Sequence, residues 1–380
     1  MEKLNILFVI PQLEKGGSET LVYNVASLLD RKLFNVSLAF FHFYGNESFR
    51  KAFHDQGIRL YQIPHNGTKK LISMTMIARI IRDKEIHIVN AHHFFSMIHS
   101  FYACKIAHRR KLVYTEHSSL ELDQLPFKWR LLGRLVLGQS DTAIGISDDV
   151  TQMLKEIFNL RGADCTTISN GVDIENGENI REVGAIRDQF ALADKIKIVT
   201  AVANYRKVKN HLLLLQAFRE LLKEFRNVRL LLVGQGNAND SENSEGEVRR
   251  YIEENSMVQE VILTGHRSDV RDLLAMTDVF CLTSFQEGLP ISLLEAMSSG
   301  LPVVGTNVKG IRDVIVDGKN GFLVPLGDPI ALKDSIRKIL SNESLKRSFG
   351  RESRKIIQDS YSINACVNRY QSLFMSLMKR

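Results

Sequence analysis

Two glutamates flank the start of a predicted helix in the second half of the chain. Glu287 lies in the loop before that helix and Glu295 on its second turn, because the fixed φ of Pro290 suits the first helical turn. The free N–H groups at the start of a helix form a ready site for phosphate. Two carboxylates beside a phosphate would repel it unless they serve another group of the ligand. We therefore interpret both glutamates as hydrogen-bond acceptors for the hydroxyls of a sugar or a ribose.

A repeated alternation of strand-like and helix-like patterns must position these residues. Strands that alternate with helices are typical of a parallel sheet covered on both faces. Because the alternation occurs twice, we expect an α/β chain with two Rossmann-like, doubly wound parallel-sheet domains. The expected strands are 4–10, 36–41, 87–90, 111–114, 142–146 and 166–170 in the first domain, and 196–201, 228–233, 261–264, 278–283 and 302–305 in the second. The expected helices include 18–29, 70–83, 129–137, 211–225, 247–255, 270–276 and one that starts at Pro290.

The boundary between the two domains is expected near residue 172. Residues 173–184 contain few large apolar side chains, which is typical of a segment between domains. We therefore expect a first domain at 1–172, a linker at 173–190 and a second domain at 191–359. Ligands of doubly wound sheets bind outside the carboxyl ends of the strands. Two such sheets facing each other would make one deep cleft, with a bulky anionic nucleotide on one side and a second substrate on the other.

Length and composition exclude several classes of protein. The chain has 380 residues, of which 44% are hydrophobic and 24% charged, as is ordinary for a globular protein of about two to three domains. A net charge of +7 fits anionic ligands or an acidic membrane surface and is too weak to indicate nucleic acid. Four scattered cysteines indicate free thiols in a reducing, cytoplasmic compartment. No apolar run approaches the roughly 18 residues of a membrane span. Disordered, small secreted, fibrous and integral-membrane classes are therefore excluded.

A set of motifs in one order resembles the family 4 retaining glycosyltransferases of the GT-B fold. The carboxylate stretch E-G-L-P-I-S-L-L-E at 287–295 has the E-x7-E arrangement of that family. The other motifs are K-G-G-S-E-T-L at 15–21, T-E-H-S at 115–118, S-N-G-V-D at 169–173, L-L-V-G-Q-G at 231–236, L-T-G-H-R at 263–267 and D-G-K-N-G-F-L-V at 317–324. The resemblance covers most of the chain.

The resemblance implies a role for each matching position. Glu295 would bind the ribose hydroxyls, and Glu287 would contact the transferred sugar. His117 would act as a hydrogen-bond donor to the donor sugar near the reacting centre. Backbone groups at the diphosphate and the sugar would come from Gly16, Gly17, Gly288, Leu289, Pro290 and Ile291, and the base would lie against Gly265, His266 and Arg267.

The same resemblance implies an arginine and a lysine that neutralise the diphosphate. Lys209 fits the lysine, and Arg206 is the best candidate for the arginine, with Lys207 as a competitor. The sequence contains no Asp-x-Asp pair, which metal-dependent glycosyltransferases usually carry. Fixed cations and a helix N-terminus can replace the metal. We therefore expect a metal-independent enzyme without a cofactor, with a nucleoside diphosphate sugar as co-substrate.

The expected function is transfer of a hexose or N-acetylhexosamine, with retention, from a nucleoside diphosphate sugar to a glycan or lipid-linked acceptor. A UDP-sugar is favoured on family frequency alone, and surface polysaccharide or glycolipid assembly is the expected pathway. Two alternatives remain open: a GT-B sugar-nucleotide epimerase, and a non-catalytic sugar-nucleotide-binding protein. The glutamates, His117, Lys209 and the Gly16-Gly17 pair favour an enzyme over a silent binder.

Four further features each have a structural and a functional interpretation. His92 and His93 are adjacent on a strand and are expected to point in opposite directions, which disfavours a metal site with His117. Glu116 is disfavoured as a catalytic base. The helix with Lys128, Trp129, Arg130 and Arg134 either packs its apolar side on the domain or lies on the inner membrane face. The last helix, near 361–378, is expected to pack on the first domain through Tyr370, Leu373, Phe374 and Leu377.

Overall fold

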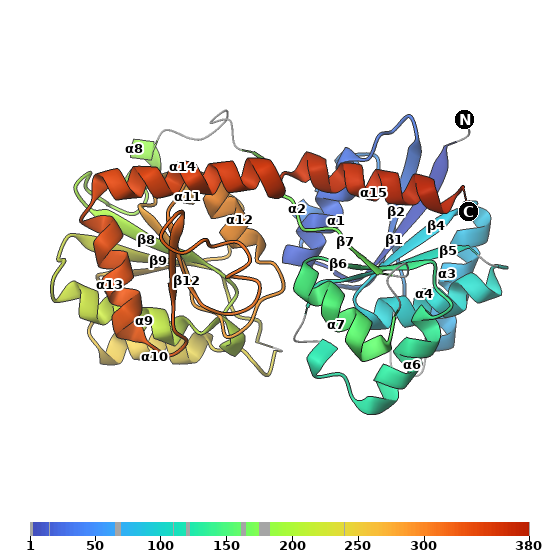
Figure 1. The fold of residues 1–380 in the computed structure, drawn as a ribbon, viewed down its shortest axis with the longest axis horizontal. Helices are drawn as coiled ribbons and strands as arrows, with labels where there is room; N and C mark the ends of the chain where they lie inside the picture. Colours follow the sequence, from blue (N-terminus) through green and yellow to red (C-terminus); the bar gives the residue numbers. More distant parts are fainter. Residues whose placement is uncertain are drawn as a thin grey trace. The chain divides into compact units, whose positions relative to one another are not determined.

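The computed structural model describes residues 3–14, 16–64, 70–108, 110–118, 122–160, 165–174, 183–238 and 240–379. The chain divides into two compact units. Unit 1 comprises Met1–Gly171 and Ile363–Arg380, and unit 2 comprises Val172–Ser362 (Figure 1). Of the expected linker 173–190, residues 175–182 lie outside the described residues. Residues 183–188 form helix α8, whose Ile186 is buried in the core of unit 2.

Unit 1 is built on a parallel sheet of seven strands in the order β3-β2-β1-β4-β5-β6-β7. Residues 6–10 of the central strand β1 are at most 1% exposed, because helices cover both faces of the sheet. The strands are β1 (Leu4–Leu13), β2 (Phe34–Phe43), β3 (Arg59–Gln62), β4 (Ile88–His92), β5 (Lys111–Glu116), β6 (Thr142–Gly145) and β7 (Cys165–Thr167). The helices are α1 (Gly17–Leu28), α2 (Glu47–Asp55), α3 (Lys70–Asp83), α4 (Phe94–Ile106), α6 (Phe127–Leu137) and α7 (Asp148–Phe158).

The last helix, α15 (Ile363–Leu377), packs on unit 1 and is drawn in red in Figure 1. Its Phe374 ring meets the rings of Phe8 and Phe34 edge-on, each at a centroid distance of 6.3 Å. The side chain of Gln371 accepts a hydrogen bond from the backbone N–H of Asp30 at 2.9 Å. Tyr370, Phe374 and Leu377 are buried, so one face of the helix completes the core under β1 and β2.

Unit 2 is built on a parallel sheet of six strands in the order β10-β9-β8-β11-β12-β13. The strands are β8 (Lys197–Val202), β9 (Val228–Val233), β10 (Val261–Gly265), β11 (Val279–Leu282), β12 (Val303–Thr306) and β13 (Gly321–Val324). The helices are α8 (Val183–Asp188), α9 (His211–Leu222), α10 (Glu245–Glu254), α11 (Val270–Ala275), α12 (Ile291–Ser298), α13 (Pro329–Leu340) and α14 (Glu343–Ser360).

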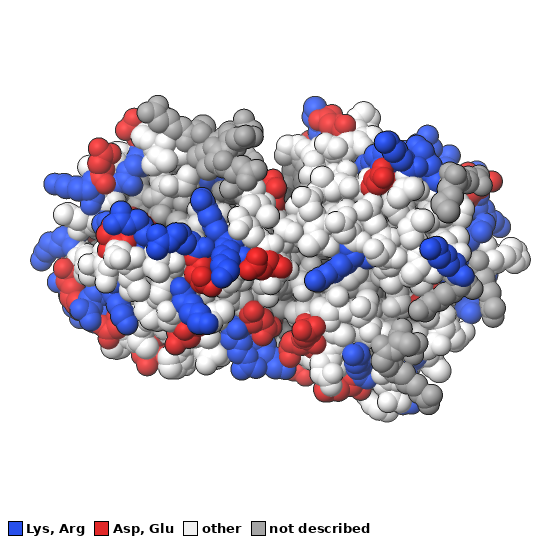
Figure 2. Space-filling model, turned by 45° about the horizontal axis from the view of Figure 1, so that its top comes forward, with Lys and Arg blue, Asp and Glu red and all other residues white. Residues whose placement is uncertain are grey.

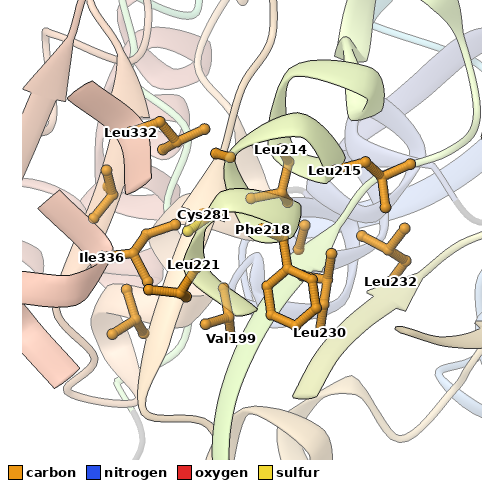
Figure 3. Close-up of a cluster of buried hydrophobic side chains, with 14 of the residues drawn as sticks. Val199, Leu214, Leu215, Phe218, Leu221, Leu230, Leu232, Cys281, Leu332 and Ile336 are labelled. Atoms are coloured by element: carbon orange, nitrogen blue, oxygen red, sulfur yellow. The ribbon is translucent and has the colours of Figure 1, made fainter. Parts of the chain in front are cut away.

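Two apolar clusters lie on the two faces of the sheet in unit 2. Val199 contributes to the larger cluster, while its neighbour Ile198 contributes to the smaller one, because successive side chains of a strand point to opposite faces. The larger cluster joins β8, β9 and β11 to α9 and α13; Figure 3 shows Phe218 of α9 and Ile336 of α13 over the strands. The prediction of two doubly wound parallel-sheet domains is confirmed.

In each sheet the third, second, first, fourth, fifth and sixth strands of the unit lie next to one another in that order. The chain therefore reverses its direction of winding between the first and the fourth strand. This switch point lies between β1 and β4 in unit 1 and between β8 and β11 in unit 2. Open α/β sheets bind ligands outside the carboxyl ends of the strands at this point. On the face that Figure 2 shows, Lys and Arg side chains lie among Asp and Glu side chains. The local chemistry of the loops at the switch points therefore identifies the candidate sites.

Candidate functional site

The switch point of unit 2 brings together two loops that are far apart in sequence. The loop after β8 contains Arg206 and Lys209, and the loop after β11 contains Glu287. The backbone N–H of Phe285 donates to the carbonyl of Val208 at 2.8 Å. The hydroxyl of Thr283 donates to the carbonyl of Asn210 at 3.0 Å. The end of β11 therefore fixes the loop that carries the cations.

Lys209 and Glu287 form an ion pair where these loops meet. Lys209 Nζ lies 2.7 Å from Oε1 and 2.9 Å from Oε2 of Glu287. The hydroxyl of Ser284 donates to Oε1 at 2.5 Å. The side chain of Glu287 is only 9% exposed and that of Lys209 is 23% exposed, so the ammonium keeps an open side while the carboxylate is held in place. The pair offers a cation for an anionic group next to a fixed hydrogen-bond acceptor.

Gly310 supports this loop from behind. Its φ is +78°, a left-handed conformation that favours glycine. A Cβ at this position would lie 2.6 Å from the carbonyl oxygen of Glu287 and 2.8 Å from that of Gly288. The close backbone contact needs a glycine, and the sequence analysis did not identify it.

The predicted helix after this loop is α12, which begins at Ile291 with Pro290 at its N-cap. Gly300 follows it at φ +78°, as the left-handed end of such a helix requires. Leu293, Leu294 and Met297 are buried, whereas Glu295 is half-buried on the opposite face, one turn after Ile291. Helical side chains lean toward the N-terminus. The Cα–Cβ bond of Glu295 therefore tilts toward the start of α12, and its expected contact with the ribose stays a prediction.

The two arginines of the expected site already have ion-pair partners. Arg206 Nε lies 2.8 Å from a carboxylate oxygen of Asp240. Arg267 binds both carboxylate oxygens of Asp269, at 2.7 and 2.6 Å. Arg267 follows Gly265, which has φ +69°, and an exposed His266. The guanidinium of Arg267 is thus fixed by two hydrogen bonds at the carboxyl end of β10. Arg206, at the carboxyl end of β8, makes an ion pair and is 43% exposed, and the competing Lys207 is exposed.

The histidines of unit 1 gather at its own switch point. His92 ends β4, and His117 follows β5. His92 Nδ1 lies 2.7 Å from His117 Nε2, and the ring of His93 stacks on that of His117 at a centroid distance of 4.9 Å. The expectation that His92 and His93 point in opposite directions is wrong. The strand ends at His92, and a φ of +67° turns His93 back toward His117.

Gly16 and Gly17 lie at the same switch point, where β1 leads into α1. The carboxylate of Glu19, on the first turn of α1, accepts a hydrogen bond from the hydroxyl of Ser18 at 2.9 Å. A Cβ on Gly16 would lie 2.6 Å from this carboxylate. Glu19 is only 4% exposed, and burial raises its pKa while the nearby His93 opposes that shift. Glu19 was not predicted as a site residue, although the Gly-Gly-x-Glu spacing already places it beside the glycines.

Glu116 holds the turn that carries His117. Its Oε1 accepts the backbone N–H groups of His117 and Ser118 at 2.7 and 2.9 Å, and its other oxygen accepts the hydroxyl of Tyr114. The carboxylate is fully buried. These contacts make Glu116 a structural support of the His117 backbone.

The described residues contain neither a cluster of metal ligands nor a helix that could span a membrane. Among them, no three His, Cys, Asp or Glu side chains come together as metal ligands. None of the described helices is both long and apolar enough to cross a membrane.

Both units match known protein families. Residues 15–176 match "Glycosyltransferase Family 4", and residues 183–356 match "Glycosyl transferases group 1". N-acetyl-alpha-D-glucosaminyl L-malate synthase of Bacillus anthracis is 26% identical over 331 residues, which cover 86% of this chain and 84% of that relative. UDP-Gal:alpha-D-GlcNAc-diphosphoundecaprenol alpha-1,3-galactosyltransferase of Escherichia coli is 22% identical over 346 residues, with 85% of each chain covered.

Solved structures share the fold. Anabaena HepE, in its crystal structure with UDP-glucose, has a TM-score of 0.86 and 19% identity, covering 98% of this chain and 100% of HepE. WaaG, a glycosyltransferase involved in lipopolysaccharide biosynthesis, has a TM-score of 0.76 and 18% identity, covering 97% and 99%. The two doubly wound units with their switch-point loops therefore have the GT-B fold of glycosyltransferases. Within that class, the chain belongs to glycosyltransferase family 4.

Proposed function

We propose that this glycosyltransferase moves a hexose or N-acetylhexosamine from a UDP-sugar to a glycan or lipid-linked acceptor, with retention and without a metal ion. The observation that carries the proposal is the Lys209–Glu287 pair at the switch point of unit 2. A cation next to a fixed acceptor suits a ligand that joins a diphosphate to a sugar. The relatives support the sugar-nucleotide class: one is named for UDP-Gal and alpha-D-GlcNAc-diphosphoundecaprenol, and HepE is solved with UDP-glucose.

Each part of the site has a role in this proposal. Glu295 accepts the ribose hydroxyls, and the N–H groups at the start of α12 face the diphosphate. Lys209 exchanges one carboxylate oxygen of Glu287 for a phosphate oxygen, which leaves that carboxylate oxygen for a hydroxyl of the sugar. Arg206 adds a second cation, and Arg267 with Gly265 and His266 borders the base. Charge develops on the leaving diphosphate, so fixed cations stabilise the transition state more than the ground state.

Donor hydrolysis without acceptor tests the reaction class. The purified chain is incubated with UDP-glucose and, separately, with UDP-N-acetylglucosamine, with and without EDTA. We expect UDP and free sugar from at least one donor, at an equal rate in EDTA. A changed sugar that is still attached to UDP would indicate an epimerase, and no turnover would indicate a binder. Loss of activity in EDTA that Mg²⁺ restores would contradict metal independence.

The role of Glu287 has its own control. Glu287→Gln keeps the shape of the side chain and removes its charge, so we expect turnover to fall at least about 10-fold, the scale of one lost charge-assisted contact. Glu224→Gln removes a carboxylate from an exposed ion pair with Lys333 in the same unit and should leave turnover unchanged. Equal turnover in both variants would contradict the proposed site. Anomeric retention is tested separately, by NMR of the product linkage.

An exposed apolar stripe on α6 supports contact with the inner membrane face. Phe127, Leu131 and Leu135 recur every four residues and are 82%, 52% and 58% exposed. Lys128 is exposed beside them, and Trp129 packs on Phe95 at a centroid distance of 5.4 Å. An apolar stripe with flanking cations is typical of helices that lie on anionic lipid.

Vesicle co-sedimentation tests this contact. The triple variant with Phe127, Leu131 and Leu135 changed to serine should lose binding to vesicles with anionic lipid. The matched control changes the exposed Val258, Leu326 and Ile330 of unit 2 to serine and should bind like the unaltered protein. Equal binding of both variants would contradict a membrane role for α6.

A further inference from the structure

A chain of hydrogen bonds runs from the interior of unit 1 to His117. Asn90 and His92 lie two residues apart on β4, so both side chains point to one face of the sheet. Asn90 Oδ1 lies 3.1 Å from His92 Nε2. His92 Nδ1 lies 2.7 Å from His117 Nε2. Asn90 is fully buried and His92 is 1% exposed, so water does not compete for these bonds.

The orientation of Asn90 fixes the direction of this chain. Asn90 Nδ2 donates to the carbonyl oxygen of Val113 at 3.4 Å and to the hydroxyl oxygen of Thr115 at 2.9 Å. A carbonyl oxygen only accepts, so the amide nitrogen of Asn90 must face Val113. Its oxygen therefore faces His92, and His92 Nε2 must carry the hydrogen.

The protonation of both histidines follows from that first bond. Burial, together with the neighbouring His93, lowers the pKa of His92 to about 3. His92 is therefore neutral near pH 7, carries its one hydrogen on Nε2 and accepts at Nδ1. His117 must then donate through its own Nε2. Burial and the two neighbouring histidines hold the pKa of His117 well below its usual value, so its Nδ1 keeps a lone pair.

The remaining contacts of His117 leave Nδ1 to a ligand. The backbone N–H of His117 is held by Glu116. Its ring is held at Nε2 by His92 and packs against the ring of His93 at a centroid distance of 4.9 Å. Within the described part of the chain, its ring hydrogen bond is made through Nε2 alone. The position and the tautomer of the His117 ring are therefore both fixed, so the lone pair of Nδ1 points in one direction.

We infer that Asn90 and His92 are positioning residues, which hold His117 as its Nε2–H tautomer so that Nδ1 accepts a hydrogen bond from a sugar hydroxyl. This inference rests on the proposed function for the identity of the ligand and deepens it. It differs from the expectation that His117 is a hydrogen-bond donor. A neutral Nδ1 acceptor recognises an O–H group and repels the oxygen of a phosphate.

The tautomer is measured directly by two-bond ¹H–¹⁵N NMR of the ligand-free protein near pH 7.5, with His117→Asn to assign the signals. We expect one protonated nitrogen, Nε2, and one unprotonated nitrogen, Nδ1. His92→Gln retains a donor and an acceptor and should keep this pattern. His92→Leu should give a mixture of tautomers. An Nδ1–H or a charged imidazole at His117 in the unaltered protein overturns the inference, and so does an unchanged pattern in His92→Leu.

Kinetics with UDP-glucose and UDP-N-acetylglucosamine test the consequence. His92→Leu and Asn90→Leu should each lower kcat about 10- to 100-fold, the scale found when a partner that orients a metal-ligating histidine is removed. The double variant should lose little more, because residues that act as a unit are not additive. UDP affinity should not change, and His92→Gln should restore most of kcat. His99→Leu is the matched control: His99 is equally buried in the same unit and should change melting temperature without changing kcat.

The results separate this inference from the proposed function. If the tautomer is as inferred but neither donor is turned over, the proposed function fails and the role of Asn90 and His92 in fixing His117 stands. If a donor is turned over and His92→Leu keeps its kcat, the proposed function stands and the positioning role is wrong.

Discussion

Gly310→Ala perturbs the candidate site through the backbone of Glu287 and Gly288. The new Cβ would lie 2.6 and 2.8 Å from the carbonyl oxygens of Glu287 and Gly288, and ordinary contact begins at 3.4 Å, so one segment must shift by about 0.6 to 0.8 Å. The left-handed φ costs a further roughly 1–2 kcal/mol for any residue with a Cβ, and overpacking typically costs about 1–3 kcal/mol. A 1 Å misplacement of a reacting group lowers a rate by about 100-fold.

Gly318→Ala is the control that separates these terms. Gly318 has nearly the same φ, +72°, but no atom lies within 4 Å of its added Cβ. Urea unfolding should show a loss of about 1–2 kcal/mol for Gly318→Ala and a larger loss for Gly310→Ala. UDP-sugar turnover should fall about 10- to 100-fold in Gly310→Ala only. Equal stability losses with normal turnover in both variants would refute the claim that Gly310 sets the position of the Glu287 loop.

Three further outcomes are expected. Glu295→Ala should weaken UDP and UDP-sugar alike by about 1.5–3 kcal/mol per lost bond, measured by calorimetry; unchanged UDP affinity would make Glu295 an ordinary helix residue. His117→Ala should lower kcat about 100-fold with unchanged UDP affinity, whereas a lower melting temperature with normal kcat would indicate a packing role. His92 has a folded pKa near 3 against about 6.5 when unfolded. The unfolded chain therefore binds the proton first, so stability is full above pH 6.5 and falls as the pH drops toward 3, by at most about 1.4 kcal/mol per pH unit. Urea titrations at pH 7.5 and 5 measure this loss, which should shrink in His92→Gln.

The sequence predicted best the elements that begin and end at residues with a strong preference for helix termini. Pro290 and Gly300 bracket α12, and the structure places the helix between them, at Ile291–Ser298. The strand β3 was missed because its four residues, R-L-Y-Q, lie at the sheet edge and contain no apolar run. Helix α2 was missed although Asn46 caps it by accepting from the N–H of Phe49, a signal that the sequence already contained.

The contacts within the site were harder to predict than its members. Lys209 and Glu287 are separated by 78 positions, and motif spacing does not say which cation meets which carboxylate. The rule that ligands bind at the switch point predicts which loops form the site. It does not predict that Lys209 pairs with Glu287. The direction of the His93 side chain depends on the positive φ of His93 itself, just after β4. The alternation of side chains along a strand does not predict this φ. The need for glycine at position 310 comes from the close approach of its backbone to that of Glu287 and Gly288. Such an approach leaves no periodic pattern in the sequence.

The two switch points share a strand order but differ in their chemistry. In unit 2 the loops carry full charges, Lys209 against Glu287 and Arg206 against Asp240. In unit 1 burial lowers the pKa of His92 and of His117, and the neighbouring His93 lowers both further. A departing diphosphate gains negative charge, so fixed cations stabilise it. A sugar presents hydroxyls that keep no net charge, and neutral acceptors bind them without attracting the phosphates.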